Sequence, residues 1–193
     1  MSFINDSIPD ELSLVKGLNP KRITSTAFIP QNFDALLALA VNDYKTLEDN
    51  FKQYSRYKNI ALPEINFDLL SAIDEIAWLK LQENKALLFR LINDENINPL
   101  LFSQKVSSGS YRGQELFNQK LPQDLLTLLE TYGMLTNPKW GVQLGSFVIF
   151  AEDKTFLKQI IGAYLDGKTL ENDLNFKNLN DDLADNSTFL WLG

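Results

Sequence analysis

The chain contains no histidine and no cysteine among its 193 residues. These absences exclude a Ser-His-Asp or Cys-His triad, a histidine-ligated zinc, a thiolate nucleophile and a disulfide. Histidine is also the commonest general acid or base, so its absence lowers the expectation of an enzyme, although carboxylate catalysis stays open. We therefore predict that the chain is not an enzyme and that it has no catalytic residue, no cofactor and no metal site.

Long apolar runs and clusters of basic residues are also missing. No apolar run approaches the length of about 18 residues that a membrane span needs, so we expect no direct membrane insertion of this segment. Residues Met1 to Asp10 lack the basic and apolar regions of a signal peptide. The 18 Lys and Arg residues are scattered against 25 Asp and Glu, and the net charge of −7 argues against nucleic acid as a partner.

The residues that are present predict a folded, internally repetitive chain. The sequence is 45% hydrophobic and 11% aromatic, which is enough to bury a core. Residues Leu36–Tyr54 resemble Ser146–Tyr164, about 110 positions later: in both, an apolar run ends at an aspartate, Asp43 or Asp153, and a helical pattern follows. The aspartates are placed to cap those helices. The alternative is two unrelated strand-helix units of similar composition.

Shorter matches in the same order extend the repeat. Pro9 matches Pro122, Pro20 matches Pro138, and Trp78 matches Trp191. We predict a first module over residues 1–135, with part of a preceding repeat at 1–22, and an incomplete second module over 136–193, packed with the first as one globular unit. Because the chain ends on the apolar stretch Phe189–Leu192, we expect a boundary inside a longer protein; the alternative is a terminal strand of a complete domain.

Strand and helix patterns alternate along the chain and predict an α+β fold. We expect an antiparallel or mixed sheet with helices on one face, built from a repeated strand-helix-helix-strand unit. Gly17 and Gly133 suit left-handed helix ends. The predicted strands are 23–29, 36–41, 76–81, 86–92, 114–118, 140–143, 146–151 and 188–192; the predicted helices begin at Pro9, Asp43, Asn66, Ile97, Pro122, Asp153 and Asn175; residues 107–110 are expected to be a polar Ser/Gly patch.

Residues Gly162–Thr169 fit the phosphate-loop pattern G-x-x-x-x-G-K-[ST]. That chemistry needs an open glycine-rich loop between a strand and a helix, whose N–H groups hold phosphates. Here the preceding strand ends near Ala151, and Gly162 falls inside a helical pattern that Tyr164 continues. We therefore predict that Gly167 ends a helix and that the motif binds no phosphate.

Other candidate sites are weaker. Residues Asp94–Asn98 begin like a calcium loop, but Pro99 and Lys105 stand where that loop needs glycine and glutamate, so a polar loop is expected. Asp181, Asp182 and Asp185 could face a metal but are more typical of a solvated helix end. Trp78 and Trp191 are expected to pack in the core rather than to form a ligand platform.

The stretch Tyr164–Phe176, followed by Leu183–Leu190, resembles tandem modules of large uncharacterised Bacteroidota proteins that are secreted or lipid-anchored in the envelope. The resemblance is clearest over residues 146–192 and diffuse over 20–92, where Tyr54–Tyr57 lacks the glycine. It implies the periplasm or cell surface, a longer parent chain and no established activity. A non-catalytic structural or interaction module, with a protein or envelope component as partner, is our preferred interpretation. The alternatives are a nucleotide-binding hydrolase using Gly162–Thr169 and a small acidic inhibitor or immunity-type protein.

Overall fold

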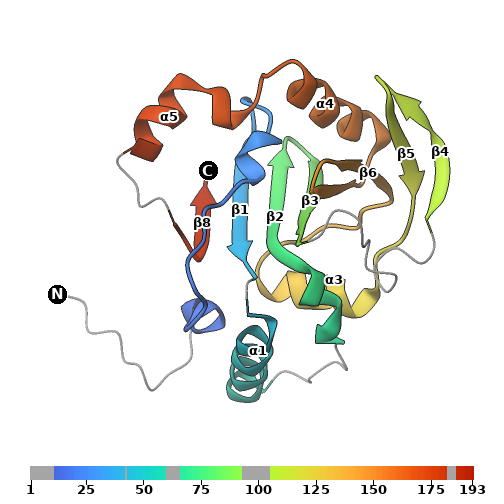
Figure 1. Ribbon diagram of the computed structural model, residues 1–193. Helices are drawn as coiled ribbons and strands as arrows, with labels where there is room; N and C mark the ends of the chain where they lie inside the picture. The colour runs from blue at the N-terminus through green and yellow to red at the C-terminus, as the bar shows by residue number, and fades with distance from the viewer. Residues whose placement is uncertain (1–10, 42, 60–65, 93–104, 182–185) are drawn as a thin grey trace.

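The computed structural model describes residues 11–41, 43–59, 66–92, 105–181 and 186–193. These residues form one eight-stranded sheet in the order β4-β5-β6-β7-β3-β2-β1-β8, and every neighbouring pair is antiparallel (Figure 1). Strands from both predicted modules, 1–135 and 136–193, therefore share the sheet. The strands are β1 (Ala35–Ala40), β2 (Ile73–Leu81), β3 (Asn84–Leu91), β4 (Val106–Tyr111), β5 (Gln114–Asn118), β6 (Trp140–Leu144), β7 (Phe147–Ala151) and β8 (Phe189–Leu192).

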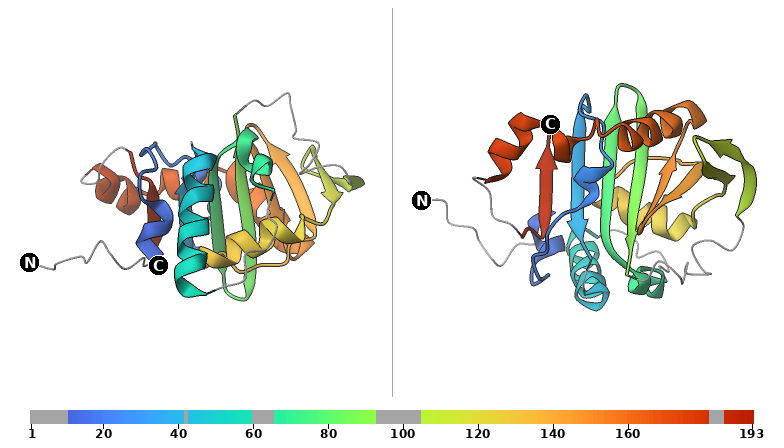
Figure 2. Two further views of the ribbon diagram at one scale, coloured as in Figure 1. Left: turned by 90° about the horizontal axis from the view of Figure 1, so that it is seen from below. Right: turned by 45° about the horizontal axis from the view of Figure 1, so that its top comes forward.

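Helices cover both faces of this sheet, as the view from below in Figure 2 shows. One face carries α1 (Tyr44–Lys58) and α3 (Gln123–Thr131), and the other carries α4 (Lys154–Leu165) and α5 (Leu174–Asp181). The α+β class and the antiparallel sheet are confirmed, but the prediction of helices on one face is wrong. The reason lies in the strands: alternate residues of β1 enter opposite cores, Leu37 and Leu39 one, Leu36 and Ala38 the other. A strand buried on both faces needs a helical layer on each.

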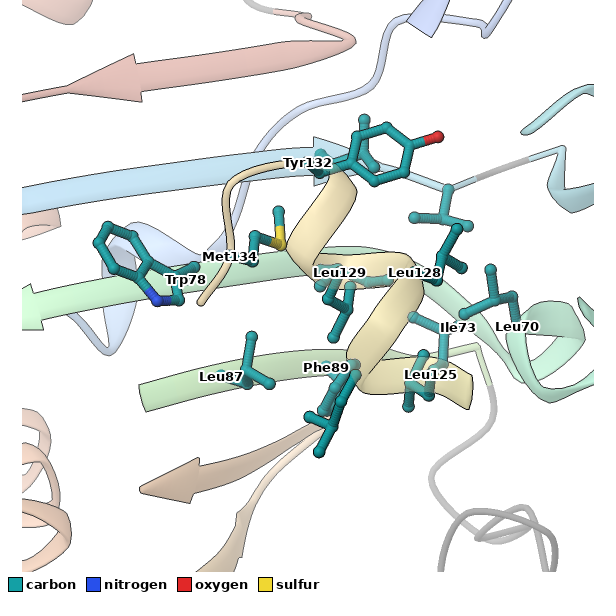
Figure 3. Packing of buried hydrophobic residues seen from close by; sticks show 14 of the residues in the cluster. Leu70, Ile73, Trp78, Leu87, Phe89, Leu125, Leu128, Leu129, Tyr132 and Met134 are labelled. Atoms are coloured by element: carbon teal, nitrogen blue, oxygen red, sulfur yellow. The ribbon is translucent and has the colours of Figure 1, made fainter. Parts of the chain in front are cut away.

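Helix α3 shows how such a layer is anchored. Its apolar side chains Leu125, Leu128 and Leu129 are each 1% exposed and pack over β2 and β3, where Ile73 and Phe89 are fully buried (Figure 3). Burial of a leucine or phenylalanine side chain stabilises a fold by about 1.5–3 kcal/mol, so this cluster contributes substantially to holding the helix on the sheet. Pro122 is the N-cap residue of α3, and Gly133, with φ +80°, follows its last turn as predicted.

The two matched segments, Leu36–Tyr54 and Ser146–Tyr164, have similar local geometry. Strand β1 leads through Asp43 into α1, and β7 leads through Asp153 into α4. The Asp43 carboxylate accepts hydrogen bonds from the N–H groups of residues 45 and 46, and the Asp153 carboxylate accepts them from those of residues 155 and 156. The matched residues also point the same way. Leu37 and Leu39 face the core of α1, and Phe147 and Ile149 face the core of α4. Both capping predictions are confirmed.

Beyond the two helices, the chain takes different paths. After α1 it returns as β2, directly beside β1, whereas after α4 it crosses to the far edge of the sheet and forms β8 on the other side of β1. The matched tryptophans consequently both lie opposite one residue, Leu37. Trp78 is 8% exposed and packs in the core as predicted, but Trp191 is 55% exposed, so the packing prediction for Trp191 is wrong.

One predicted strand is wrong: residues 23–29 form no strand but contain a 3-10 turn at Ser25–Ala27. The polar Ser/Gly patch at residues 107–110 lies in strand β4. Further 3-10 turns lie at Glu11–Val15, at Phe67–Ala72 before β2 and at Leu170–Asn172 before α5. Of the helix predicted to begin at Pro9, the described part, Glu11–Val15, is a 3-10 helix, and the helix predicted near Ile97 lies outside the described residues.

Candidate binding groove

A groove of about 780 Å³ lies along α4, from Thr155 to Ala163. Its other walls come from the β2–β3 turn, the β4–β5 turn and the segment 30–32 that precedes β1. Figure 1 shows α4 passing over this end of the sheet, next to the β4–β5 hairpin. The side chains that line it are mostly polar and include five amides, Gln31, Asn32, Gln82, Asn84 and Gln159. Amide side chains donate and accept hydrogen bonds, so the walls suit a ligand with both kinds of group.

The groove carries more positive than negative charge. Lys158, Lys168 and Arg112 line it together with a single carboxylate, Asp166. Arg112 Nη2 lies 2.8 Å from Asp166 Oδ1, and this hydrogen bond is the main reason why the pKa of Asp166 is lowered and the pKa of Arg112 is raised. The carboxylate is thus ionised and paired. Lys158 and Lys168 remain as the positive charge that the groove offers to a ligand, in a chain whose net charge is −7.

Lys158 is held in place by an aromatic neighbour. Its Nζ atom lies 5.5 Å from the centroid of the Tyr111 ring, at the end of strand β4. Such a cation–π contact contributes about 0.5–1 kcal/mol at an exposed site. It orients the ammonium group across the groove between α4 and the β4–β5 hairpin.

Two turns in the wall each contain a residue whose backbone is left-handed, a conformation that is unfavourable for residues with a Cβ atom. Gln82, in the β2–β3 turn, has φ +56°, and Arg112, in the β4–β5 turn, has φ +50°. Left-handed backbone is uncommon for residues other than glycine. Arg112 is followed by Gly113 at φ +84°, the pattern of a two-residue hairpin turn with both central residues left-handed. The Gln82 N–H donates to the Asp34 carboxylate, which holds the other turn. Unfavourable backbone of this kind gathers at binding sites in many proteins.

The phosphate-loop pattern lies in the wall of this groove, but its backbone is engaged elsewhere. Gly162 is within α4, and Gly167 follows the helix with φ +65°, as predicted. The N–H groups of residues 166, 167 and 168 donate to the carbonyls of residues 162, 164 and 163, at 2.9, 3.2 and 2.8 Å. These bonds are those of a helix C-terminus. The Thr169 side chain is buried and accepts from Asn172, so it does not face the groove as a Mg²⁺ ligand would.

A second polar cluster lies within the fold and serves to attach a segment. Glu75 is 2% exposed, and its carboxylate accepts from the N–H and hydroxyl of Thr24 and from the N–H of Ser25, at 2.8–2.9 Å. Asp74 Oδ2 lies 2.9 Å from Lys21 Nζ, and Asp74 Oδ1 lies 3.6 Å from Arg90 Nε. Sequence reasoning missed this pair, although two acids inside the apolar stretch Ile73–Leu81 were a signal for it. The contacts fasten residues 21–25 to the sheet.

The remaining candidates contribute no site that the structure describes. Asp94–Asn98 and Asp182 and Asp185 lie outside the described residues, as does the side chain of Asp181. Within the described part of the chain, no three acidic side chains come close enough to hold a metal ion. In the same part, no helix has both the length and the apolar character to cross a membrane.

Comparisons with protein-family models, with curated proteins and with solved structures gave no match. The groove is therefore interpreted from its own residues.

Proposed function

We propose that the chain is a non-catalytic interaction module of an envelope protein, and that the groove binds an extended acidic segment of a partner protein. The observation that carries this proposal is the charge of the groove: Lys158 and Lys168 face it, while its one carboxylate, Asp166, is paired with Arg112 at 2.8 Å. Complementary charge steers a partner and sets specificity. The amides on the walls suit the peptide groups between acidic side chains.

The same charges support a role other than catalysis. A general base must lose and regain a proton near neutral pH, which requires a pKa near the working pH. The pKa of Asp166 is shifted the opposite way, downward, by Arg112. The loop that would bind a nucleotide has its N–H groups in a helix end. Lys168 alone would attract phosphate only as a point charge.

The envelope location rests on the resemblance of residues 146–192 to envelope modules. We also infer that the two strand-cap-helix units, Leu36–Tyr54 and Ser146–Tyr164, derive from one building block. Their matched caps and their matched inward-facing residues support this inference. A module of this kind would place its groove beside others in a longer parent chain.

Fluorescence anisotropy with a labelled deca-glutamate peptide tests the groove. We expect binding that weakens with added salt, because exposed charges are screened. Each exposed ion pair contributes up to about 1 kcal/mol, so the double change Lys158→Gln/Lys168→Gln should weaken binding about tenfold. The matched control is Lys45→Gln/Lys120→Gln, which removes two exposed lysines outside the groove and should leave binding unchanged.

Two results would contradict the proposal. One is the absence of peptide binding by the unaltered chain at low salt; the other is equal weakening by the control pair, which would mean that the peptide senses only overall charge. A parallel titration with ATP and Mg²⁺ separates the nucleotide alternative. A nucleotide at 100 times its Kd should raise the free energy of unfolding by about 2.7 kcal/mol, whereas we expect no change in Tm.

A further inference from the structure

The tip of the β4–β5 hairpin lies beside α4 (Figure 1) and is held there by side-chain contacts. Strand β5 pairs with β6 through residues 116–118, so the turn at Arg112 lies beyond the stretch that the sheet holds. Lys154 Nζ donates to the Ser108 carbonyl at 2.7 Å, and Arg112 Nη2 lies 2.8 Å from Asp166 Oδ1. The hairpin thus brings the Arg112 guanidinium to the end of α4, in the wall of the groove.

Asp166 stands at a position where a carboxylate does not stabilise a helix. It is the C-cap residue of α4, and the last turn of α4, as the structure describes it, contains no basic residue. The C-terminal end of a helix is the negative end of its dipole, so a carboxylate there is unfavourable. Helix α1, in the matched unit, ends at the neutral Asn59. The stability of α4 therefore does not explain the carboxylate, and its contact with Arg112 points to a role in the groove.

Both members of the pair are accessible from the groove. The side chains of Arg112 and Asp166 are 41% and 43% exposed, and both line the groove. A guanidinium binds a carboxylate through charge-assisted hydrogen bonds, and here a carboxylate of the chain itself takes that place. The pKa of Asp166 is lowered mainly by the Arg112 hydrogen bond and further by the charge of Lys168. Asp166 thus interacts with two of the cations in the groove.

We propose that Asp166 is an internal competitor of the acidic ligand: its carboxylate occupies Arg112 in the free protein, and a carboxylate of the bound segment replaces it. This inference rests on the proposed acidic-peptide groove and adds the regulation of that site. A group on the same chain competes at a high effective concentration. Asp166 therefore keeps the affinity of the groove below the value that Arg112, Lys158 and Lys168 would give together.

Fluorescence anisotropy with labelled deca-glutamate at low salt tests the contact through Asp166→Asn, which keeps the size of an exposed side chain and removes its charge. Arg112 is then free for a peptide carboxylate. Because an exposed ion pair changes an equilibrium constant by up to about fivefold, the peptide Kd should fall by about that factor. The matched control is Glu171→Gln. Glu171 is 49% exposed and its Oε1 atom lies 3.9 Å from Arg22 Nη2, outside the groove, so the Kd should stay unchanged.

A second substitution shows whether the gain depends on Arg112. Adding Arg112→Gln to Asp166→Asn removes one positive and one negative charge in all, so the net charge stays at −7. The addition should cancel the gain, because Lys158 and Lys168 are again the charges that the groove offers. Asp166→Ser, which removes the carboxylate with a different side chain, should give the same gain as Asp166→Asn.

The inference is overturned if the unaltered chain binds the peptide and neither Asp166 variant binds it more tightly, a result that leaves the acidic-peptide groove in place. It is also overturned if Glu171→Gln gives the same gain, or if the double variant binds as tightly as Asp166→Asn. Binding by Asp166→Asn but not by the unaltered chain would contradict the proposed function and support the internal competition. If neither chain binds, both proposals are wrong.

Discussion

The ring of Phe117, on β5, occupies the space in which a side chain at Gly141, on β6, would lie. The two residues are directly paired across the strands, and a Cβ atom added at position 141 would lie 2.2 Å from Phe117 Cε2 and 2.5 Å from Cζ. Phe117 is also packed edge-on against Phe150, with ring centroids 5.7 Å apart. The ring therefore lies over Gly141 of β6 and ends against Phe150 of the next strand, β7, and it has little room to move.

Gly141→Ala should accordingly destabilise the fold. Overpacking in a well-filled core costs about 1–3 kcal/mol, because side chains and backbone must shift. Denaturant unfolding followed by tryptophan fluorescence measures the change. The matched double variant is Phe117→Leu/Gly141→Ala. If the Phe117 ring is the obstacle, Gly141→Ala should lower the free energy of unfolding less in the Phe117→Leu variant than in the unaltered chain. Equal costs in the two backgrounds would refute this explanation.

Gly162→Ala, by contrast, should raise the free energy of unfolding. Gly162 is in the interior of α4 and the nearest atom to an added Cβ is Arg112 Nη1, at 4.0 Å. Alanine in a helix interior is more favourable than glycine by about 0.5–1 kcal/mol, so the free energy of unfolding should rise by that amount. The result bears on the phosphate-loop pattern, since a loop glycine would not tolerate the change. A clear loss of stability would mean that position 162 is not ordinary helix.

The local units were predictable from sequence because short-range physics determines them. An aspartate between an apolar run and a segment with helical periodicity is well placed to cap the helix, and Asp43 and Asp153 both do so. Residues 23–29 were not predictable in this way. Their composition favours a strand, but Glu75, about 50 residues away, holds Thr24 and Ser25 in a 3-10 turn.

Long-range arrangement was the part that sequence could not provide. The matched tryptophans suggested equivalent strands, yet β8 crosses the sheet to pair with β1, and no local pattern records that path. The groove has the same origin. It is assembled from turns at residues 30–32, 82–84 and 111–112 around α4, and of its lining residues only those within the pattern Gly162–Thr169 had been part of a discussed motif.

The helix caps give a prediction with a pH dependence. Asp43→Ala and Asp153→Ala should each lower the free energy of unfolding by about 0.5–2 kcal/mol, as capping residues do. Asp49→Ala, an exposed acid later in α1, is the control and should change it by less than about 0.5 kcal/mol. Hydrogen bonds from the Thr46 hydroxyl and N–H lower the pKa of Asp43 in the folded state.

A carboxyl whose folded pKa is depressed stabilises the fold above its unfolded pKa of about 3.9, and this contribution is lost as the pH falls through the folded value. The difference between the unaltered chain and Asp43→Ala should therefore be constant near pH 7 and shrink below about pH 4. Urea titrations at pH 7, 4 and 2.5 test this. A difference that is independent of pH would show that the ionised carboxylate is not what stabilises α1.

Gln82 provides the last test, because it combines backbone strain with a position in the groove. Its φ of +56° is unfavourable for a residue with a Cβ atom, by about 1 kcal/mol. Glycine removes that cost and keeps the N–H that donates to Asp34. We therefore expect Gln82→Gly to raise the free energy of unfolding by up to about 1 kcal/mol, while Glu83→Gly, at the next position of the same turn, should not raise it. If the Gln82 amide contacts the bound peptide, Gln82→Gly should also weaken deca-glutamate binding despite the gain in stability. A variant that is more stable and binds equally well would remove Gln82 from the binding site and leave its backbone conformation without a functional reason.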